Sequence, residues 1–438
     1  MHEDPRDQIL AFGTAISEGA APDPATGARA VPIHLTTSFV FESSDHAASL
    51  FNLERAGHVY SRISNPTNAV LEQRVAALEG GIGAIATASG QAALHLSVAT
   101  LMDAGSHIVA STALYGGSQN LLHYTMRRFG IETTFVQPGD LDGWRAAIRP
   151  ETRLLFGETV GNPGLDVLDI PAVSDIAHAV GVPLLVDSTL TSPYLIRPFD
   201  HGADLVYHSA TKFLSGHGTV IGGVVVDGGS FDWERSGRFT GLTEAYAGFH
   251  GMVFSEESTV GAFLLRARRE GLRDFGASMS PHTAWLILQG IETLPLRMER
   301  HIDNTQKVVE FLAEHPFVAR VGHPLMPSHP SHALAGRLLR HGARGAGAVF
   351  SFDLRGSRAQ GKAFIEALRL FSHLANVGDC RSLVIHPAST THFRMTDEAL
   401  AGAGISQGTI RLSIGLEDPA DLIDDLRRAL KAAEKAGA

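Results

Sequence analysis

Cysteine is almost absent from this chain. Cys380 is the single cysteine among 438 residues, so no disulfide can form within the chain. A chain without disulfides suits a reducing compartment. The first eight residues, MHEDPRDQ, carry three acids before any apolar run, unlike a secretory signal or a transit peptide. We therefore expect a cytoplasmic protein.

Long hydrophobic runs and an excess of basic residues are also missing. No stretch approaches the roughly 20 apolar residues that cross a bilayer, so we expect no membrane partner. Acids outnumber Lys and Arg by 46 to 36, for a formal charge of −10, which makes nucleic acid a poor candidate partner. His323, His329 and His332 share a Pro-rich segment but lack regular ligand spacing, and we expect no metal site.

What the chain does contain is an alternation of short apolar runs and helical patterns, most of them separated by Gly or Pro. Strands separated by helices predict an α/β fold, with a mostly parallel sheet flanked by helices on both faces. Ligands of such sheets collect at the carboxyl ends of the strands. We expect a helix at 68–78 and strands at 84–88, 107–111, 132–136, 154–158, 184–187 and 205–208.

The rest of the chain divides into an arm and a smaller unit. Residues 1–62 show little periodicity, and we expect an extended arm that contacts a neighbouring subunit. Residues 63–290 would form the large domain, and 291–438 a smaller C-terminal α+β domain. In this last part we expect helices at 280–300, 303–314, 360–371 and from Pro419, and strands at 347–353 and 410–414.

Asp187 and Lys212 follow two consecutive predicted strands and should meet at one edge of the sheet. A buried acid is costly without a cationic partner, so Asp187 suits a protonated ring nitrogen, although a helix cap or loop acid explains it equally well alone. Lys212 supplies an amine that can form an imine with an aldehyde. Together they fit pyridoxal phosphate, whose pyridinium proton a carboxylate can hold.

Phosphate donors lie close to these two residues in the sequence. Ser209 and Thr211 place hydroxyls on either side of the segment that leads to Lys212. The segment Ala88-Ser-Gly-Gln91 follows a predicted strand and opens a helix, where free backbone N–H groups bind phosphate well. These residues predict a phosphate site beside the lysine.

Six separated motifs now point to a known family. They are Tyr60-Ser-Arg62, Ser89-Gly-Gln-Ala-Ala93, Leu114-Tyr-Gly-Gly117, Asn162-Pro163, Asp187-Ser-Thr189 and Ser209-Ala-Thr-Lys212. In this order they resemble the Cys/Met-metabolism enzymes of pyridoxal-phosphate fold type I, and the resemblance runs from about Gly13 to the final helix. It implies a pyridoxal 5'-phosphate enzyme of sulfur amino-acid metabolism.

By that resemblance Lys212 carries the cofactor as a Schiff base, Asp187 pairs with the pyridine nitrogen and Tyr115 stacks on the ring. Further cofactor contacts that it implies are Gly90, Gln91, Ser209 and Thr211 at the phosphate, Asn162 and Glu158 near the ring, and Tyr60 and Arg62 at the phosphate of the neighbouring subunit. The last two roles require at least a dimer, and the family resemblance implies a homotetramer.

The resemblance also implies how the substrate is held. Arg411 resembles the family's clamp for the substrate carboxylate, a role that suits an arginine fork, and Ser382 and Asn162 would line the same site. Lys212 would remove the Cα proton, with Tyr115 and Tyr60 assisting proton and leaving-group traffic.

Three features favour the O-acetylhomoserine sulfhydrylase branch of this family. They are an insertion at Gly228–Gly251, the segment Ser382–His392, and Gln91 in place of a common methionine. The reaction so implied replaces the acetate of O-acetyl-L-homoserine by sulfide or methanethiol, giving homocysteine or methionine. A methionine or cystathionine γ-lyase, or a cystathionine γ-synthase that uses O-succinylhomoserine, stays the alternative, although Gly117 stands where methionine γ-lyases carry cysteine.

Overall fold

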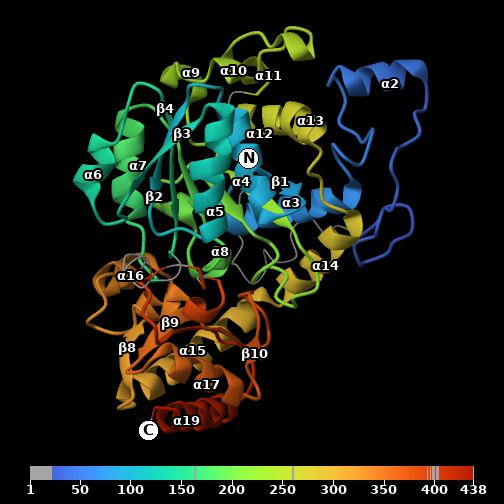
Figure 1. The fold of residues 1–438 in the computed structure, drawn as a ribbon. Coiled ribbons are helices and arrows are strands. Elements are labelled where there is room, and N and C mark those ends of the chain that lie inside the picture. The colour runs from blue at the N-terminus through green and yellow to red at the C-terminus, as the bar shows by residue number, and fades with distance from the viewer. Residues whose placement is uncertain are drawn as a thin grey trace, which may run out of the picture.

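The computed structural model describes residues 22–161, 164–258, 261–391, 393–394, 396, 400 and 404–437. Two sheets organise this part of the chain, with the larger sheet and its helices above the smaller one in Figure 1. The predicted α/β fold with a smaller C-terminal α+β unit is confirmed. The domain boundaries at 62/63 and 290/291 stay predictions.

The larger sheet has the strand order β1-β7-β6-β5-β4-β2-β3. Its central strands are buried along their whole length because helices cover both faces, which explains their continuous apolar runs. The bounds are β1 Gly83–Thr87, β2 His107–Ser111, β3 Glu132–Val136, β4 Thr152–Glu158, β5 Leu184–Asp187, β6 Leu205–His208 and β7 Gly223–Asp227. Six of these strands lie where the sequence predicts them.

The strand β7 is absent from the expected set. It is antiparallel to both β1 and β6 and lies between them, so the chain inserts its last large-sheet strand next to its first. The run Val224–Val226 is short and follows a Gly-rich loop, which hides it from a search for strand–helix alternation.

Helices cover the two faces of this sheet as separate apolar layers. One layer contains α3 (Pro66–Glu79) and α7 (Ile170–Ala179); the other contains α4 (Gly90–Leu101) and α12 (Ala262–Arg266). The shorter helical segments are α5 Gly116–Asn120, a π-helix Leu121–Thr125, 3₁₀ turns Met126–Phe129, Pro198–His201 and Ala247–Phe249, α6 Leu141–Ala146, α8 Ser192–Leu195, α9 Trp233–Ser236, α10 Thr240–Thr243, α11 Phe254–Glu257, a second π-helix Ala267–Leu272 and α13 Arg273–Phe275.

The smaller sheet has the order β10-β11-β12-β9-β8 and is mostly antiparallel. Its elements are α14 Pro281–Glu292, α15 Leu294–Glu314, β8 Val318–Gly322, α16 His332–Leu338, a 3₁₀ turn Gly342–Ala346, β9 Val349–Leu354, α17 Arg358–Ala367, β10 Ser372–His373, β11 Leu383–Ile385, a 3₁₀ turn Pro387–Ser389, β12 Thr409–Ser413 and α19 Pro419–Lys435. The strands β8, β10 and β11 were not predicted.

Two predicted helix ends in this part are wrong, for physical reasons that lie in the side chains. The helix expected to end at residue 300 ends at Glu292, because Pro295 opens the next helix and has no N–H for the previous one. The helix expected to reach residue 371 ends at Ala367. There the buried Asp425 of α19 accepts the N–H groups of Arg369 and Leu370 at 2.8 to 3.1 Å, which replaces continued helix bonding.

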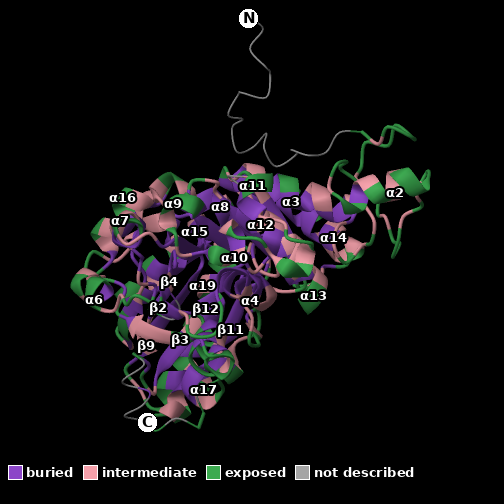
Figure 2. Ribbon diagram, turned by 90° about the horizontal axis from the view of Figure 1, so that it is seen from above, coloured by how far each residue is buried: buried purple, intermediate pink, exposed green. Residues whose placement is uncertain are grey.

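The described part of the arm is mostly exposed, as the green colouring around α2 in Figure 2 shows. The helix α2 (Ser44–Phe51) contradicts the expectation of an arm without helices, and Ser43 caps it by accepting the His46 N–H. Leu35 and Val40 expose 71% and 96% of their surface, so apolar groups of the arm face water within this single chain. That a neighbouring subunit covers these side chains stays a prediction.

Asp227 at the end of β7 predicts a pH-dependent stability. It is 2% exposed, and burial raises its pKa to about 7, with the charge of Asp204 adding to the shift. A carboxyl whose folded-state pKa is raised stabilises the fold fully below pH ~4 and progressively less as pH rises through ~7, for a loss of about 4 kcal/mol. The Gly229 N–H donates to its Oδ1, and Asn could accept that bond equally well.

We therefore expect Asp227→Asn to raise the melting temperature at pH 8 and to change it little at pH 5. The gain at pH 8 should be roughly 2 kcal/mol and not the full 4, because the amide NH₂ that replaces Oδ2 would be buried where Oδ2 has no hydrogen-bond partner. The exposed Asp142 gives the control variant Asp142→Asn, with no such pH trend. Equal effects of Asp227→Asn at both pH values would contradict the assignment.

Candidate active site

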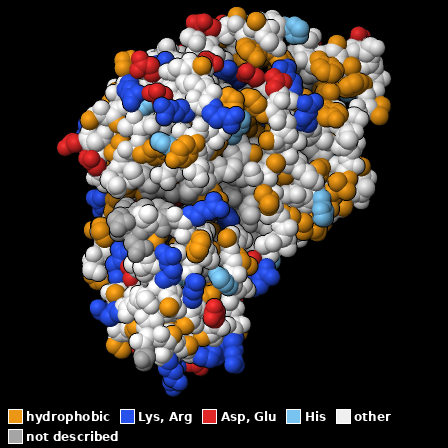
Figure 3. Space-filling model, in the orientation of Figure 1, with side chains coloured by type: hydrophobic (Ala, Val, Ile, Leu, Met, Phe, Trp, Pro, Cys, Tyr) orange, Lys and Arg blue, Asp and Glu red, His pale blue; other side chains and the backbone are white. Residues whose placement is uncertain are grey.

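The carboxyl ends of β4, β5 and β6 lie side by side at the edge of the large sheet that faces the smaller unit (Figure 1). The strand register pairs Glu158 with Asp187 and Asp187 with Tyr207, and Lys212 follows β6 after a three-residue connection. Figure 3 shows the molecular surface hollowed between the two units at this level. The sheet thus collects the predicted site residues, as such edges do.

Asp187 and Glu158 form a pair of buried carboxyl groups. They are 8% and 6% exposed, and burial raises the pKa of both; the charge of Asp187 raises that of Glu158 further. Asp187 Oδ1 accepts the Thr189 N–H at 2.9 Å, and the Tyr207 hydroxyl also bonds its carboxylate. A buried acid of this kind is stabilised as an anion only when a cation lies against it.

The other carboxyl group, Glu158, accepts the backbone N–H of Tyr115 at 2.5 Å. That bond fixes the start of α5, where the Tyr115 side chain is 54% exposed and free to cover a ligand. The geometry therefore gives Glu158 a positioning role toward Tyr115. Its predicted contact with the cofactor is not tested.

Lys212 is half-buried, and its ammonium donates a hydrogen bond to the Asn376 side-chain oxygen. Burial lowers its pKa, and the positive charge of Arg411 lowers it further. Asn376 is a residue that sequence reasoning missed. It lies 164 positions from Lys212, in the loop between β10 and β11, and belongs to none of the motifs quoted above, so no sequence signal identified it.

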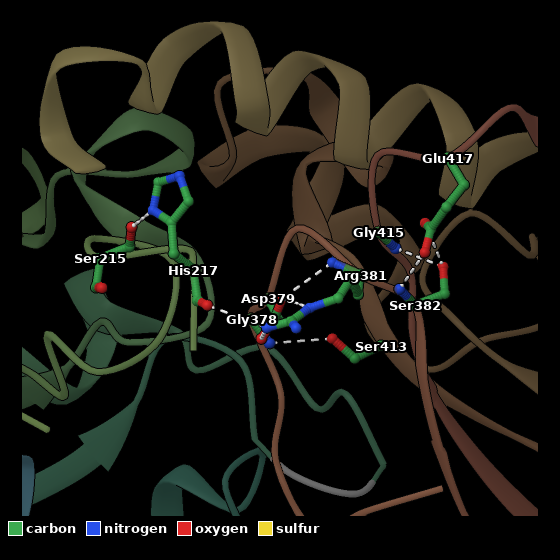
Figure 4. Close-up of polar contacts among 9 residues, drawn as sticks. All are labelled: Ser215, His217, Gly378, Asp379, Arg381, Ser382, Ser413, Gly415 and Glu417. Carbon is green, nitrogen blue, oxygen red and sulfur yellow. Dashed lines mark hydrogen bonds and ion pairs between the residues drawn. The ribbon is translucent and has the colours of Figure 1, made fainter. Parts of the chain in front are cut away.

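The loop that carries Asn376 packs directly on the lysine. Gly378 has φ +76°, and a Cβ there would lie 2.9 Å from the Cβ of Lys212, so only glycine fits without displacing the lysine. The Gly378 N–H donates to the Ser413 hydroxyl at 3.0 Å, and Arg381 donates to the His217 carbonyl oxygen at 3.1 Å (Figure 4). These contacts join the smaller unit to the segment after Lys212.

Ser382, a predicted substrate contact, lies within the framework of the smaller unit. It is fully buried; its hydroxyl donates to a Glu417 carboxylate oxygen at 2.9 Å and accepts the Gly415 N–H at 2.8 Å (Figure 4). Its own N–H donates to the same carboxylate at 2.7 Å. These bonds occupy the hydroxyl and hold β11 against the end of β12. Contact with the substrate stays a prediction.

Arg411 lies on β12 and brings a guanidinium to the same site. Burial lowers its pKa, while the Tyr115 phenol acts in the opposite direction. Since Arg411 also acts on Lys212, the three side chains share one electrostatic environment although they are far apart in sequence. An arginine beside an amine whose pKa is lowered can hold a carboxylate next to a proton acceptor.

The predicted phosphate donors form a narrow cradle. Ser89 caps α4 by accepting the Ala92 N–H at 3.1 Å, which leaves the first N–H groups of a twelve-residue helix directed outward. A Cβ on Gly90 would lie 2.7 Å from the Cβ of Ser209, so the helix start and the segment before Lys212 are in contact. Thr211 Oγ1 accepts the Gly222 N–H at 3.0 Å, and Gln91 donates to the Ser118 hydroxyl at 3.5 Å.

Three predicted residues do not join this group within the described chain. Asn162 lies outside the described residues. Tyr60 is 42% exposed, and Arg62 lies 5.4 Å over its ring and donates to the Arg273 carbonyl oxygen at 2.6 Å. These contacts keep both residues at the base of the arm, in keeping with a function outside their own subunit.

A profile of the family of Cys/Met metabolism PLP-dependent enzymes matches residues 13–431. The chain belongs to this family. Its pyridoxal-phosphate dependence, predicted from the motifs, is thereby confirmed.

Relatives within the Cys/Met metabolism family include a Leptospira meyeri O-acetyl-L-homoserine sulfhydrylase, 51% identical and aligned over 95% of this chain and 96% of its own. A homocysteine synthase of Schizosaccharomyces pombe is 47% identical, with the same coverage of 95% and 96%. A solved structure from Campylobacter jejuni, assigned as an O-acetylhomoserine (thiol)-lyase, has TM-score 0.93 and 37% identity over 96% of this chain and all of its own; one of its lysines carries a pyridoxyl monophosphate group.

The described residues of this family member fit pyridoxal phosphate on their own chemistry. The cradle at Gly90 leaves no room for a side chain but offers helix N–H groups and hydroxyls for a dianion. Lys212 offers the amine, and the buried Asp187 offers an anion for a ring nitrogen.

Among the described residues, no group of three or more His, Cys, Asp or Glu side chains could hold a metal ion. Within the same residues, no helix combines the length and apolarity that a bilayer crossing needs.

Proposed function

We propose that this chain catalyses γ-replacement on O-acetyl-L-homoserine, in which sulfide takes the place of acetate and homocysteine is formed. The observation that carries the proposal is the near full-length identity of 51% and 47% to an O-acetyl-L-homoserine sulfhydrylase and a homocysteine synthase. These identities favour a sulfhydrylase over the alternative of a cystathionine γ-synthase. A solved cystathionine γ-synthase structure from Xanthomonas oryzae is less similar, with 34% identity and TM-score 0.83 over 98% of this chain and 99% of its own.

Pyridoxal phosphate, when bound, supplies an aldehyde for the substrate amine and a ring that accepts electron density from the neighbouring carbon. Lys212 then takes the Cα proton, a role that its lowered pKa supports because more of the amine is neutral near pH 7. Asp187 would pair with the protonated ring nitrogen, and Tyr115, whose backbone is fixed by Glu158, would lie against the ring. Asn376 orients the lysine amine between proton transfers.

Arg411 binds the substrate carboxylate in this proposal. We expect Arg411→Lys to raise KM for O-acetylhomoserine about 10- to 100-fold, since the charge stays while the bidentate fork is lost. Steady-state kinetics at saturating sulfide measure this. The exposed Arg427 on α19 provides the control Arg427→Lys, which should behave as wild type. An unchanged KM in Arg411→Lys would contradict the assignment.

The active assembly is proposed to contain at least two copies, and four by the family resemblance. The exposed apolar side chains of the arm, and the placement of Tyr60 and Arg62 beside it, support a site shared between subunits. Mixing two inactive variants, Lys212→Ala and Arg62→Ala, should restore about a quarter of wild-type activity after subunit exchange, because half of the random dimers regain one of two sites. If Arg62 served its own subunit, the mixture would stay inactive.

The decisive experiment is product analysis with purified protein, O-acetylhomoserine and sulfide. We expect acetate and homocysteine in equal amounts, and methionine when methanethiol replaces sulfide. A γ-lyase would release 2-oxobutyrate and ammonia without sulfide, and a cystathionine γ-synthase would require cysteine as nucleophile. Either result would overturn the proposal.

We also propose a cytoplasmic location. The presence of a single cysteine, which rules out a disulfide within the chain, supports it, and cell fractionation tests it.

A further inference from the structure

A second polar cavity lies at the opposite end of the large sheet from Lys212. It has a volume of about 240 Å³ and is formed by the turn 101–106 after α4, the start of β4, the segment 238–241 and α12. Since β4 begins here and ends at Glu158, the full length of that strand separates the cavity from the active site. In Figure 1 the neighbouring helices α9 and α10 lie at the end of the molecule away from the smaller unit.

Two arginines in this cavity share the same acceptors. Nη1 of Arg153 donates to the carbonyl oxygens of Pro150 and Thr152 at 2.9 and 3.1 Å. Nη1 of Arg238 donates to the same two oxygens at 2.8 and 3.4 Å. The two guanidinium groups therefore lie next to each other, and each still has the three N–H donors of Nε and Nη2, which these bonds do not use.

The positive charges of these two arginines are not offset by an ion pair. Within the part of the chain that the structure describes, no carboxylate forms a salt bridge with Arg153 or Arg238; Glu151 and Asp103 act on Arg153 only at longer range. Burial lowers the pKa of Arg153, and the charge of Arg238 lowers it further. Such a pair of like charges is destabilising unless an anion lies between them.

The third arginine of the cavity has a different position. Arg266 is 8% exposed; it pairs with Glu270 at 2.6 Å and donates to the Thr100 carbonyl oxygen at 2.9 Å. A Cβ on Gly241 would overlap its guanidinium, so the glycine lets the segment 238–241 close over it. Arg266 thus forms a fixed cationic wall whose charge is already balanced.

We propose that this cavity binds a small dianionic oxyanion of the phosphate or sulfate class. Each guanidinium fork can donate two parallel N–H bonds to a pair of oxygens of such an anion, and the negative charge of the anion offsets the two positive charges, which a neutral ligand cannot do. The volume is below the range of about 300 to 1,000 Å³ that holds larger organic ligands. Arg238 comes from the insertion 228–251 and Arg153 from the sheet, so the anion joins the insertion to the sheet.

Titration calorimetry of the cofactor-saturated enzyme tests this, with inorganic phosphate and sodium sulfate as probes at constant ionic strength set by chloride. We expect saturable binding of one anion per chain and a rise in melting temperature with either probe. Saturating the protein with pyridoxal phosphate keeps its phosphate cradle occupied, so the signal belongs to the second cavity. Absence of saturable binding would overturn the proposal.

Variants separate this site from general charge effects. Arg238→Gln should weaken binding at least about tenfold, while Arg235→Gln, an equal charge change on the same insertion outside the cavity, should bind as wild type. Asp103→Asn should strengthen binding several-fold, because it removes the acid that lines the cavity. Arg153→Lys, with the charge kept and the fork lost, gives a second test if Arg238→Gln does not fold. Equal affinities for Arg238→Gln and Arg235→Gln would overturn the proposal, whatever the outcome for homocysteine formation.

Discussion

Replacing Lys212 by alanine is expected to lower the rate of homocysteine formation at least about 10³-fold. The reason is that one amine serves two purposes. It is the proposed anchor for the cofactor and the proposed acceptor of the Cα proton, and its neighbours Asn376 and Gly378 leave no room for another base to reach the same position.

Initial rates with O-acetylhomoserine and sulfide measure this effect. The exposed Lys307 on α15 supplies the matched control, because Lys307→Ala removes the same charge far from the site and should keep full activity. Circular dichroism separates loss of chemistry from loss of folding. A Lys212→Ala enzyme that retained a tenth of the wild-type rate would end this assignment.

The change Asp187→Asn is expected to lower kcat/KM about 10²- to 10³-fold, or about 3 to 4 kcal/mol, which lies at the lower end of the cost of breaking a buried ion pair. The amide has nearly the same shape as the carboxylate and can keep the bond from the Thr189 N–H, so the fold should survive. What it lacks is the negative charge that holds a proton on the cofactor ring. The substitution should therefore lower kcat/KM much more than it changes the melting temperature.

Two measurements distinguish this role from simple loss of structure. The melting temperature of the cofactor-free protein should change little or rise, because burial makes the Asp187 anion costly without its partner. The exposed Asp175 on α7 gives the control Asp175→Asn, expected to match wild type in both assays. If Asp187→Asn stayed within threefold of wild type, the ring nitrogen would need another partner.

The sequence predicted the large sheet well because its central strands are buried on both faces and read as short apolar runs between helical patterns. It failed for β7, whose partners β1 and β6 lie far from it along the chain or run in the opposite direction. The three short strands of the smaller unit were missed for a related reason. Strands of two to five residues, with exposed positions in β8 and β10, carry little periodicity.

The site residues divide in the same way. Asp187 and Lys212 were predicted because one ends a strand and the other follows the next strand, and the end of a strand has a fixed place in a parallel sheet. Glu158 was predicted only from the family resemblance. Asn376 was missed. Ser382 was predicted to contact the substrate, but in the structure its hydroxyl is already bonded to Glu417 and to the Gly415 N–H. Both lie in loops of the smaller unit, where long-range packing decides the position of each side chain and local pattern does not.

The closeness of Arg411 to Lys212 has a consequence for timing. In the proposed role of Arg411, an arriving amino acid places its carboxylate on the guanidinium and so offsets the positive charge that helps to lower the pKa of Lys212. The lysine then gains proton affinity at the moment when there is a proton to remove. Binding of the substrate carboxylate and the proton affinity of Lys212 are thus coupled through one arginine.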